Sequence, residues 1–358
     1  MTRPREQKTS STMPRSADVA RLAGVSRKTV SRVFNDEPYV SAAVRQRVLG
    51  AAETLGYRRN NAARTLASGR TRTIGVITLG TAGYGPASLL VSIERAVRDI
   101  GYALRVVSTL DADPAGIAGG VESLLEQGVD GIVISEPIDE GGVSVVVDVP
   151  VLFLGAPPAF TAVRTLTAGT GSTLLARAAT DHLLDLGHAT VHHVAGPQRW
   201  YAARDRLEGW QTALEARSRN TPPVSYGDWS AASGYAAGQE LARDSGVTAV
   251  FAAGDEMAIG LIRALLEAGR RVPEDVSVVG FDDMPVAGYV TPPLTTVRQP
   301  FEAAAREGLK LLVQAIENPH VDLPPVADPP VEVVVRASTA AAPRATPEAH
   351  VATTGRNT

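Results

Sequence analysis

From Thr73 onward, short apolar runs alternate with longer amphipathic stretches in a regular order. The longer stretches, such as SLLVSIERAVRDIGY and DEMAIGLIRALLEAGRRVP, have helical spacing and close on glycine. Unbroken apolar runs of four to seven residues are typical of strands buried on both faces of a parallel sheet. These runs are TIGVITL, ALRVVST, GIVIS, VPVLFLG, TVHHVAG, AVFAAG and VSVVGFD. The alternation predicts an α/β fold with helices on both faces of parallel sheets.

The alternation occurs twice along the chain. GVDGIVIS (128–135) followed by VPVLFLG recurs as GVTAVFAAG (246–254) followed by VSVVGFDD. Each half spans about 110–130 residues, so two doubly wound parallel-sheet lobes are predicted within residues 73–340. Such sheets bind ligands at the carboxyl ends of their strands. Those ends are Leu79-Gly80, Ser135, Gly155, Ala195-Gly196, Gly254-Asp255 and Asp282-Asp283, and only the last two offer carboxylates.

Composition limits the class of protein. The chain has 358 residues, of which 44% are hydrophobic and 20% charged, as in soluble proteins of two or three domains. No apolar run approaches the ~18 residues that span a bilayer. The basic N-terminus also lacks the apolar core of a secretory signal, so no membrane association is expected. The absence of cysteine excludes disulfides and thiolate metal sites and fits a reducing, cytoplasmic location.

Charge is distributed unevenly. Residues 1–72 hold 15 Lys and Arg against 5 Asp and Glu, which leaves the remainder of the chain, of net charge −3 overall, strongly acidic. A basic head on an acidic body is the electrostatic pattern of a protein that binds a polyanion. A solvated basic tail would give the same charge count.

The basic region carries a helical motif. Residues 17–35, ADVARLAGVSRKTVSRVFN, predict two short helices joined by a tight turn. Gly24 can adopt the positive φ that this turn requires, and Ser26 can cap the second helix. The apolar seam between the helices is expected from Ala20, Leu22, Val30 and Val33.

The second helix leaves one polar, cationic face. That face consists of Arg27, Lys28, Thr29, Ser31 and Arg32, and a DNA major groove could receive it. A third helix is expected from Ser41 to Thr54, with Gly56 as its terminator. The spacing predicts an all-α helix-turn-helix domain over residues 16–58. An ordinary three-helix bundle with a charged face is the alternative.

Three segments have no core of their own. Residues 59–72 are expected to form a hinge helix or linker whose one large apolar side chain is Leu66. That leucine is either a linker contact or a wedge for a minor groove. Residues 1–15 and 341–358 are expected to be disordered, and the latter has no leucine heptads. A homodimer is therefore expected, without a helical tetramer handle.

The helix-turn-helix motif and the segment SAAVRQRVLGAAETLGYRRNNAARTLASGRTRTIGVI resemble the LacI/GalR family of bacterial repressors. The similarity covers roughly residues 16–340 and continues through AGP (195–197), RLEGW (206–210), GDWSAASGY (227–235), GDEMAIG (254–260), VPEDVSVVGFDD (272–283) and PPLTTVRQPF (292–301). Within the family the chain is most similar to the lac-repressor-type, sugar-responsive members. The resemblance implies a dimeric transcription regulator with lobes of periplasmic-binding-protein type.

The resemblance assigns roles on the DNA side. It implies that the partner is a palindromic double-stranded operator and that Arg27, Lys28 and Arg32 read its bases. Leu66 matches the hinge position that wedges into the operator centre, and Asn60 and Ala63 fall in the same hinge segment. One departure is Arg59, where the family usually has proline opening the hinge helix.

The resemblance also assigns an effector site between the lobes. Arg206, Trp229 and Asp282 match inducer-contacting positions, and Phe301 matches an aromatic residue of the pocket. Asp255, at a strand end, is a further candidate. From residue types alone, Arg206 and Asp282 could equally form a structural salt bridge, and Trp229 could be a core aromatic residue.

Four positions depart from the sugar-binding pattern. Gly155 and Gly254 stand where these members usually have Asp and Asn, and Ala202 and Leu79 replace hydroxyl-bearing residues. Because polar partners are lost, weaker binding of a plain galactoside is expected. The implied effector is a small sugar that releases the operator, and a purine or a phosphorylated metabolite is the alternative.

Other functional classes have less support. The six histidines show no metal-binding spacing, and no nucleophile elbow, P-loop or dinucleotide fingerprint is present, so neither catalysis nor a cofactor is expected. A solute-binding protein would share the two lobes. The helix-turn-helix head and the missing signal peptide argue against that class.

Overall fold

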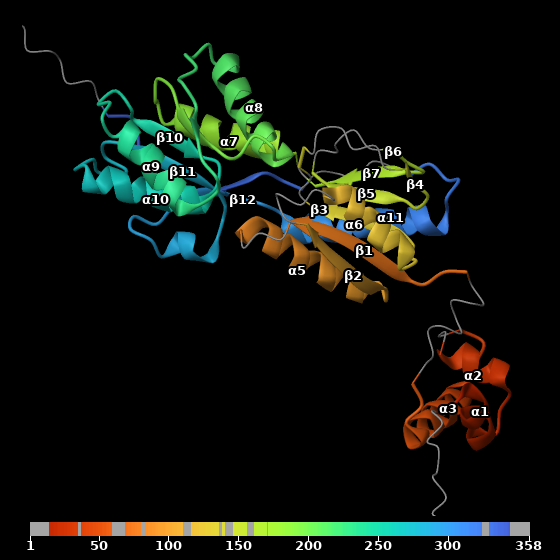
Figure 1. The fold of residues 1–358 in the computed structure, drawn as a ribbon. Helices are drawn as coiled ribbons and strands as arrows, with labels where there is room; N and C mark the ends of the chain where they lie inside the picture. Colours follow the sequence, from red (N-terminus) through yellow and green to blue (C-terminus); the bar gives the residue numbers. More distant parts are fainter. Residues whose placement is uncertain are drawn as a thin grey trace, which may run out of the picture. The chain divides into compact units, whose positions relative to one another are not determined.

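The computed structural model describes residues 14–34, 37–58, 69–79, 83–109, 116–135, 138–139, 146–155, 161–169, 171–323 and 329–343. The chain divides into two units, residues 1–71 and 72–358, which we call the head and the body (Figure 1). The predicted N-terminal disorder before residue 14 and most of the predicted hinge, residues 59–68, lie outside the described residues.

The described part of the head consists of helices around one small core. The helices are α1 (Ser16–Ala23), α2 (Arg27–Phe34) and α3 (Ala42–Leu55). Gly24 has φ 64° and ends α1, and the Ser26 hydroxyl accepts a hydrogen bond from the Thr29 amide at 3.1 Å. The Ser41 hydroxyl caps α3, and Gly56 ends it with φ 62°. The predicted turn and caps are therefore confirmed.

One predicted core residue of the head is wrong. Leu22 is 54% exposed, whereas Val19 and Ala23 are buried with Ala20. At about 100° per residue, positions 19, 20 and 23 lie within one arc of α1 and position 22 falls outside it. The seam between α1, α2 and α3 is completed by Val30, Val33, Val48, Ala51 and Ala52.

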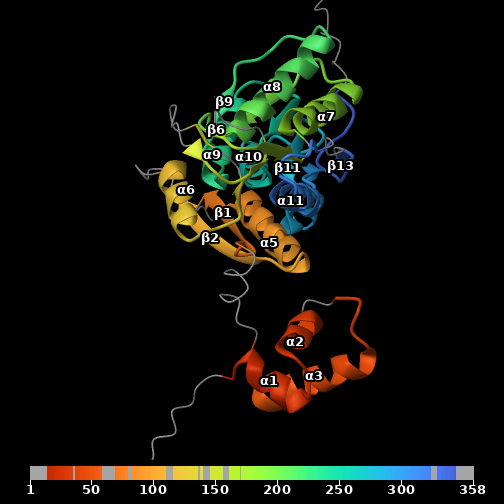
Figure 2. The ribbon, with the colours of Figure 1, turned by 90° about the vertical axis from the view of Figure 1, so that its right-hand side faces the viewer.

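The first lobe of the body is a parallel sheet of strand order β2-β1-β3-β5-β7. Its strands are β1 (Thr73–Leu79), β2 (Ala103–Thr109), β3 (Gly131–Ser135), β5 (Val151–Leu154) and β7 (Thr165–Ala168), with a separate pair of β4 (Val146–Val147) and β6 (Thr161–Ala162). Helices α5 (Tyr84–Asp99) and α11 (Phe301–Glu317) contact each other and share one core with the sheet, and α6 (Gly116–Glu126) belongs to a second core (Figure 2).

The second lobe repeats this plan. Its strand order is β13-β12-β11-β10-β8-β9, and β13 alone is antiparallel to its neighbour. The strands are β8 (His192–Ala195), β9 (Ser225–Tyr226), β10 (Ala249–Ala252), β11 (Ser277–Asp282), β12 (Thr295–Arg298) and β13 (Glu332–Val334). The helices are α7 (Ser172–Asp185), α8 (Tyr201–Ala216), α9 (Ala231–Leu241), α10 (Asp255–Glu267) and the short 3-10 helix η1 (Pro285–Gly288). Separate cores lie beneath α7 and α8 and beneath α9 and α10.

Two details differ from expectation. Strand β2 is mostly exposed because it forms the edge of its sheet, although its apolar run predicted burial on both faces. The predicted C-terminal disorder also begins too early. Ala342 donates its amide hydrogen bond to Leu186 at 2.9 Å, and Ser338 is fully buried, so a C-terminal strap from Ala337 to Ala342 belongs to the second lobe.

The described chain passes between the lobes three times: after β7, after β12 and after α11. The second of these passages contains Gln299 and Pro300, which join β12 of the second lobe to α11 of the first. The crossover helix over residues 301–317 is thus confirmed. The first two of these passages line a cleft between the lobes, through Gly169 and through Gln299 and Pro300.

The packing of α9 on α10 yields a stability prediction. A Cβ at Gly260 would lie 1.8 Å from the Ala231 carbonyl oxygen, so Gly260→Ala must push the two helices apart. We expect it to lower the free energy of unfolding of the body by about 1–3 kcal/mol. Gly50→Ala is the control, because Gly50 is exposed in α3 with nothing within 4 Å and should gain about 0.5–1 kcal/mol. Urea unfolding measures the free energy of unfolding of both variants. Equal changes in the two variants would contradict the predicted clash.

Candidate functional site

The outward face of α2 is the first candidate surface. Arg27, Lys28 and Ser31 are exposed along it, and Arg27 is its first residue. Thr29 has a different environment, because its hydroxyl lies 2.9 Å from the Ser26 hydroxyl and its amide donates to the same oxygen. Thr29 therefore also completes the N-terminal cap of the helix. The face is cationic and sterically open.

The end of α2 is held by α3. Arg45 of α3 donates to the carbonyl oxygens of Val33 at 3.1 Å and Glu37 at 3.2 Å. The Glu37 carboxylate in turn lies 3.4 Å from the Arg32 Nε, and both side chains are about two-fifths exposed. The Arg32 side chain is thus engaged by a weak ion pair that a stronger acceptor could replace.

Sequence reasoning missed one exposed aromatic residue of the head. Tyr39, in the connection between α2 and α3, is 88% exposed. The missed signal was an aromatic residue in a short polar connection that offers no core position. Asn60, Ala63 and Leu66, predicted as hinge contacts, and Arg59 all lie outside the described residues.

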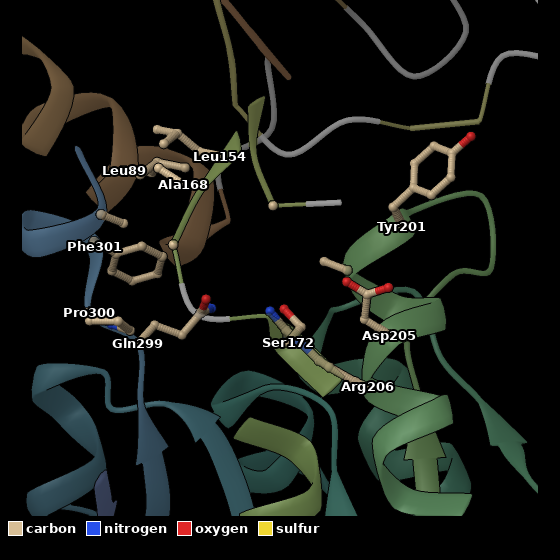
Figure 3. A pocket seen from close by; sticks show the side chains of 14 residues that line it. Leu89, Leu154, Ala168, Ser172, Tyr201, Asp205, Arg206, Gln299, Pro300 and Phe301 are labelled. Atoms are coloured by element: carbon tan, nitrogen blue, oxygen red, sulfur yellow. The ribbon is translucent and has the colours of Figure 1, made fainter. Parts of the chain in front are cut away.

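The second candidate site is a cleft between the two lobes of the body (Figure 3). It encloses about 590 Å³ of empty space, including the part open to solvent. One wall is mainly apolar, and its side chains are Leu89, Leu154, Ala168, Pro300, Phe301 and Ala304. The other wall presents the polar side chains of Ser172, Tyr201, Asp205, Arg206 and Gln299. Two of the predicted effector residues, Arg206 and Phe301, thus lie on opposite walls of one cleft.

Arg206 is almost completely buried at 4% exposure. Its guanidinium donates to the Ala253 carbonyl and lies 3.7 Å from the Asp282 carboxylate. It also stacks on the Phe281 ring at 4.0 Å from the centroid and faces the Trp229 ring at 5.1 Å. The second lobe thereby supplies both polar and aromatic partners for this buried charge.

Asp282 lies directly beneath the cleft. Its carboxylate accepts a hydrogen bond from the Gln299 side chain at 2.5 Å, in addition to the ion pair with Arg206. Burial raises the pKa of this carboxyl group, and Arg206 opposes that rise. Its backbone has φ 114°, a conformation that side chains rarely adopt, so the loop after β11 is held in a strained shape.

Asp255 does not line the cleft, although it was predicted as an effector residue. It is fully buried, and its two carboxylate oxygens accept from the Thr296 hydroxyl at 2.6 Å and the Met284 amide at 2.7 Å. Burial, followed by the nearby charge of Asp282, raises its pKa to about 7. These contacts fix the loop that begins at Asp282.

Trp229 closes one side of the space between the lobes. Its ring meets Trp200 edge to face, with centroids 5.6 Å apart, and packs against the cores of both lobes. A Cβ at Gly196 would lie 2.3 Å from the Trp229 ring, so glycine is needed there. Both indole nitrogens are buried, and neither has a hydrogen-bond partner among the described residues.

The four positions that depart from the sugar-binding pattern differ in their surroundings. Gly155 and Ala202 line the cleft, and Gly155 has φ 117° with open space around it. A Cβ at Gly254 would make ordinary contact with Trp229 at 3.7 Å, so there is room for a side chain. The Leu79 side chain lies outside the described part of the chain.

A second set of contacts joins the lobes beside the cleft. Ile138 of the first lobe forms a β-bridge with Trp200 of the second. The Asp139 amide donates to the Arg199 carbonyl at 2.7 Å, and its carboxylate pairs with Arg204 at 2.8 Å. We call these residues the interlobe clasp.

Four polar residues of the cleft were not predicted from the sequence. They are Asp205, Ser172, Tyr201 and Gln299. Residues 201, 202, 205 and 206 recur at i, i+1, i+4 and i+5 on α8, which is one face of a helix. Once Arg206 was placed in the cleft, this spacing could have identified Tyr201 and Asp205.

Among the residues that the structure describes, no group of three or more His, Cys, Asp or Glu side chains could hold a metal ion. His193 is stacked between Trp210 and Phe251, and its burial lowers its pKa to about 4. It therefore packs as a neutral core residue. No helix of the described chain is long and apolar enough to cross a membrane.

Two family models match this chain. Residues 17–60 match "Bacterial regulatory proteins, lacI family", and residues 180–339 match "Periplasmic binding protein-like domain". The first model covers the described helices of the head and the second covers most of the second lobe.

Characterised relatives match most of the chain. The lactose operon repressor of Escherichia coli is 34% identical, covering 85% of each chain. A solved lac repressor dimer bound to operator and the anti-inducer ONPF superposes with a TM-score of 0.75 over 92% of this chain and 100% of the other. CelR of Thermobifida fusca is 37% identical over 83% of this chain and 90% of that protein. A solved complex of the transcriptional regulator CelR with cellobiose superposes with a TM-score of 0.64 over 91% of this chain and 99% of the other. The HTH-type transcriptional repressor PurR of Haemophilus influenzae is 32% identical, covering 84% of this chain and 90% of that protein. The predicted fold class is confirmed.

Asp255 yields a pH prediction. Its pKa is raised in the folded protein, so the folded state holds this proton more tightly than the unfolded state, and the stability it confers falls as pH rises from about 4 to 7. Asp255→Asn removes this titration. The free energy of unfolding of the variant relative to the native protein should therefore increase over that range, as measured by urea unfolding at several pH values.

Asp275→Asn is the control for this experiment. Asp275 is exposed, and its hydrogen bonds with Arg271 hold the pKa of its carboxyl group below the usual range. Its ionisation is complete by pH 5, so the difference from the native protein should stay constant between pH 5 and 8. A constant difference for Asp255→Asn as well would contradict the raised pKa.

Proposed function

The chain belongs to the lacI family of bacterial regulatory proteins, and we propose that it represses transcription until a small sugar binds between its lobes. It is a DNA-binding transcription regulator, as its relatives are. The observation that carries the effector proposal is the cleft, in which an apolar wall faces a polar wall across the two lobes.

On the DNA side, we assign base reading to Arg27, Lys28 and Arg32. Their support is the exposure of the α2 face, its positive charge and the turn that fixes Arg32. Arginine and lysine donate to guanine in the major groove, and neutralising phosphates with the basic head gives strong salt dependence. Tyr39, which is exposed in the connection that follows α2, is suited to a phosphate contact. We further propose the hinge roles of Asn60, Ala63 and Leu66 from the family pattern.

On the effector side, a pyranose sugar suits the two unlike walls. Its C–H face is apolar and would lie against Phe301, and its hydroxyl groups would face the polar side chains of α8. Arg206 and Asp282 would then act as a prearranged pair beneath the sugar. The relatives named for the lactose operon and crystallised with cellobiose support a sugar, and PurR makes a purine the competing ligand. The proposal includes no catalytic step.

A ligand that contacts both walls favours the closed arrangement of the lobes. Closure at the three chain passages would alter how two bodies of a dimer sit together, and so how the two heads meet a palindromic operator. Coupling of this kind is reciprocal and typically amounts to about 1–3 kcal/mol. Effector and operator should therefore weaken each other's binding equally.

The test of the sugar assignment is calorimetry on the full chain with cellobiose, lactose, ribose and hypoxanthine. A binding isotherm with a sugar, together with loss of operator affinity at saturation, supports the proposal. Binding of hypoxanthine alone would replace the sugar by a purine and leave the regulator unchanged.

Arg32→Ala tests base reading. The change removes a donor on the outward face of α2, and we expect it to weaken operator binding by about 1–3 kcal/mol while binding to random DNA falls much less. Arg21→Ala is the control, since Arg21 is an exposed arginine of α1 that lies outside the face and pairs with Asp18. Fluorescence anisotropy on both DNAs measures the effect. Equal losses on operator and random DNA would show that Arg32 contacts phosphate only.

Asp282→Asn tests the effector pair. The amide keeps the shape of the side chain but loses its charge, so Arg206 is left without its carboxylate partner. We expect operator affinity within about threefold of the native protein, and sugar-induced release reduced at least tenfold. Anisotropy titrations of the protein–operator complex with cellobiose measure it. Release by the variant at native cellobiose concentrations would remove Asp282 from the site.

A further inference from the structure

Asp205 is a carboxylate in the cleft that has no partner among the described residues. It lies on α8 next to Arg206, and both residues line the cleft. No hydrogen bond or ion pair joins its side chain to any residue that the structure describes, although the side chain is only partly exposed. Figure 3 shows Asp205 and Arg206 projecting from the same helix, across the cleft from Leu154 and Phe301.

The neighbouring cation does not neutralise Asp205. The Arg206 guanidinium is directed at the Ala253 carbonyl and the Asp282 carboxylate, beneath the cleft. Burial and the nearby Glu208 charge raise the pKa of Asp205, and Arg206 only partly opposes them. The polar wall therefore carries one uncompensated negative charge when Asp205 is ionised.

A partly buried carboxylate is an acceptor only, and it costs free energy when water leaves and no donor replaces it. A ligand that closes this cleft must therefore bring hydrogen-bond donors to α8. Hydroxyl groups satisfy this requirement without adding charge. A phosphate or carboxylate placed there would meet a like charge in a space of low dielectric constant, where repulsion is strong.

We propose that Asp205 determines effector specificity: it accepts hydrogen bonds from hydroxyl groups of an uncharged sugar and rejects phosphorylated sugars at that end of the cleft. The inference rests on the proposed function, because it assumes a sugar in the same cleft. It goes beyond that function by excluding a class of metabolite and by assigning the exclusion to one residue. The role is independent of Arg206 and Asp282, which are already paired with each other.

The experiment compares two ligands and two variants of the full chain. Cellobiose and cellobiose 6-phosphate are titrated by calorimetry into the native protein, Asp205→Asn and Glu208→Gln. Glu208→Gln removes the same charge one turn further along α8, at an exposed position that does not line the cleft. Thermal unfolding of each variant shows that the fold is intact, and Asp205→Ser is used if Asp205→Asn unfolds early.

The native protein should bind cellobiose at least tenfold more tightly than its phosphate. In Asp205→Asn, cellobiose affinity should fall about 10- to 100-fold, because a charge-assisted hydrogen bond is lost. The gap between the two ligands should shrink in the same variant, since the repulsion is gone. Glu208→Gln should match the native protein both in its affinity for cellobiose and in the difference between the two ligands.

The outcomes separate the two proposals. If the native protein binds cellobiose and Asp205→Asn binds both ligands as Glu208→Gln does, the role of Asp205 is overturned and the sugar-controlled regulator stands. A native protein that prefers the phosphorylated sugar also overturns the role of Asp205 and leaves the regulator in place. If neither ligand binds, and lactose and ribose fail as well, the sugar assignment fails and the present inference fails with it.

Discussion

The second lobe's side of the cleft is organised around one buried positive charge. A guanidinium taken out of water is destabilising unless its donors and its charge are matched, and Arg206 is matched by the Ala253 carbonyl, the Asp282 carboxylate and the faces of two aromatic rings. These partners come from the ends of β10 and β11 and from the turn before α9, whereas Arg206 itself lies on α8. Several strand ends are thereby fixed relative to one another by a single side chain.

A second layer of polar contacts supports this arrangement. Asp282 could not face Arg206 with φ 114° unless the loop after it were held, and Asp255 holds that loop through the Met284 amide while also binding Thr296 of β12. Because Asp255 is enclosed beside Asp282, burial disfavours its charged form and raises its pKa to about 7. Asp255 was predicted as a ligand contact, but its side chain instead supports Asp282, another predicted contact.

The sequence was informative where local rules decide the outcome. Apolar runs, Gly24, Ser26 and Gly56 specify strands, a turn and helix ends through backbone chemistry alone, and these were predicted. Leu22 was misassigned although helical periodicity places position 22 outside the buried arc of positions 19, 20 and 23. Asp255 was misassigned and Asp205 was missed for a different reason. Which carboxylate is enclosed and which faces the cleft depends on contacts between distant segments, such as Asp255 with Thr296, that residue type does not reveal.

The same geometry explains how a small ligand could control the arrangement of the two lobes. The interlobe clasp joins the two lobes, but the side chains of its ion pair between Asp139 and Arg204 are about two-fifths exposed, and ion pairs near the surface contribute about 0–1 kcal/mol. A ligand shifts an equilibrium only by its difference in affinity between two states. A ligand that contacts both Phe301 and the α8 side chains would favour the arrangement in which these two walls face each other, and this preference can exceed the contribution of the clasp. Control of the lobes therefore depends chiefly on the occupant of the cleft.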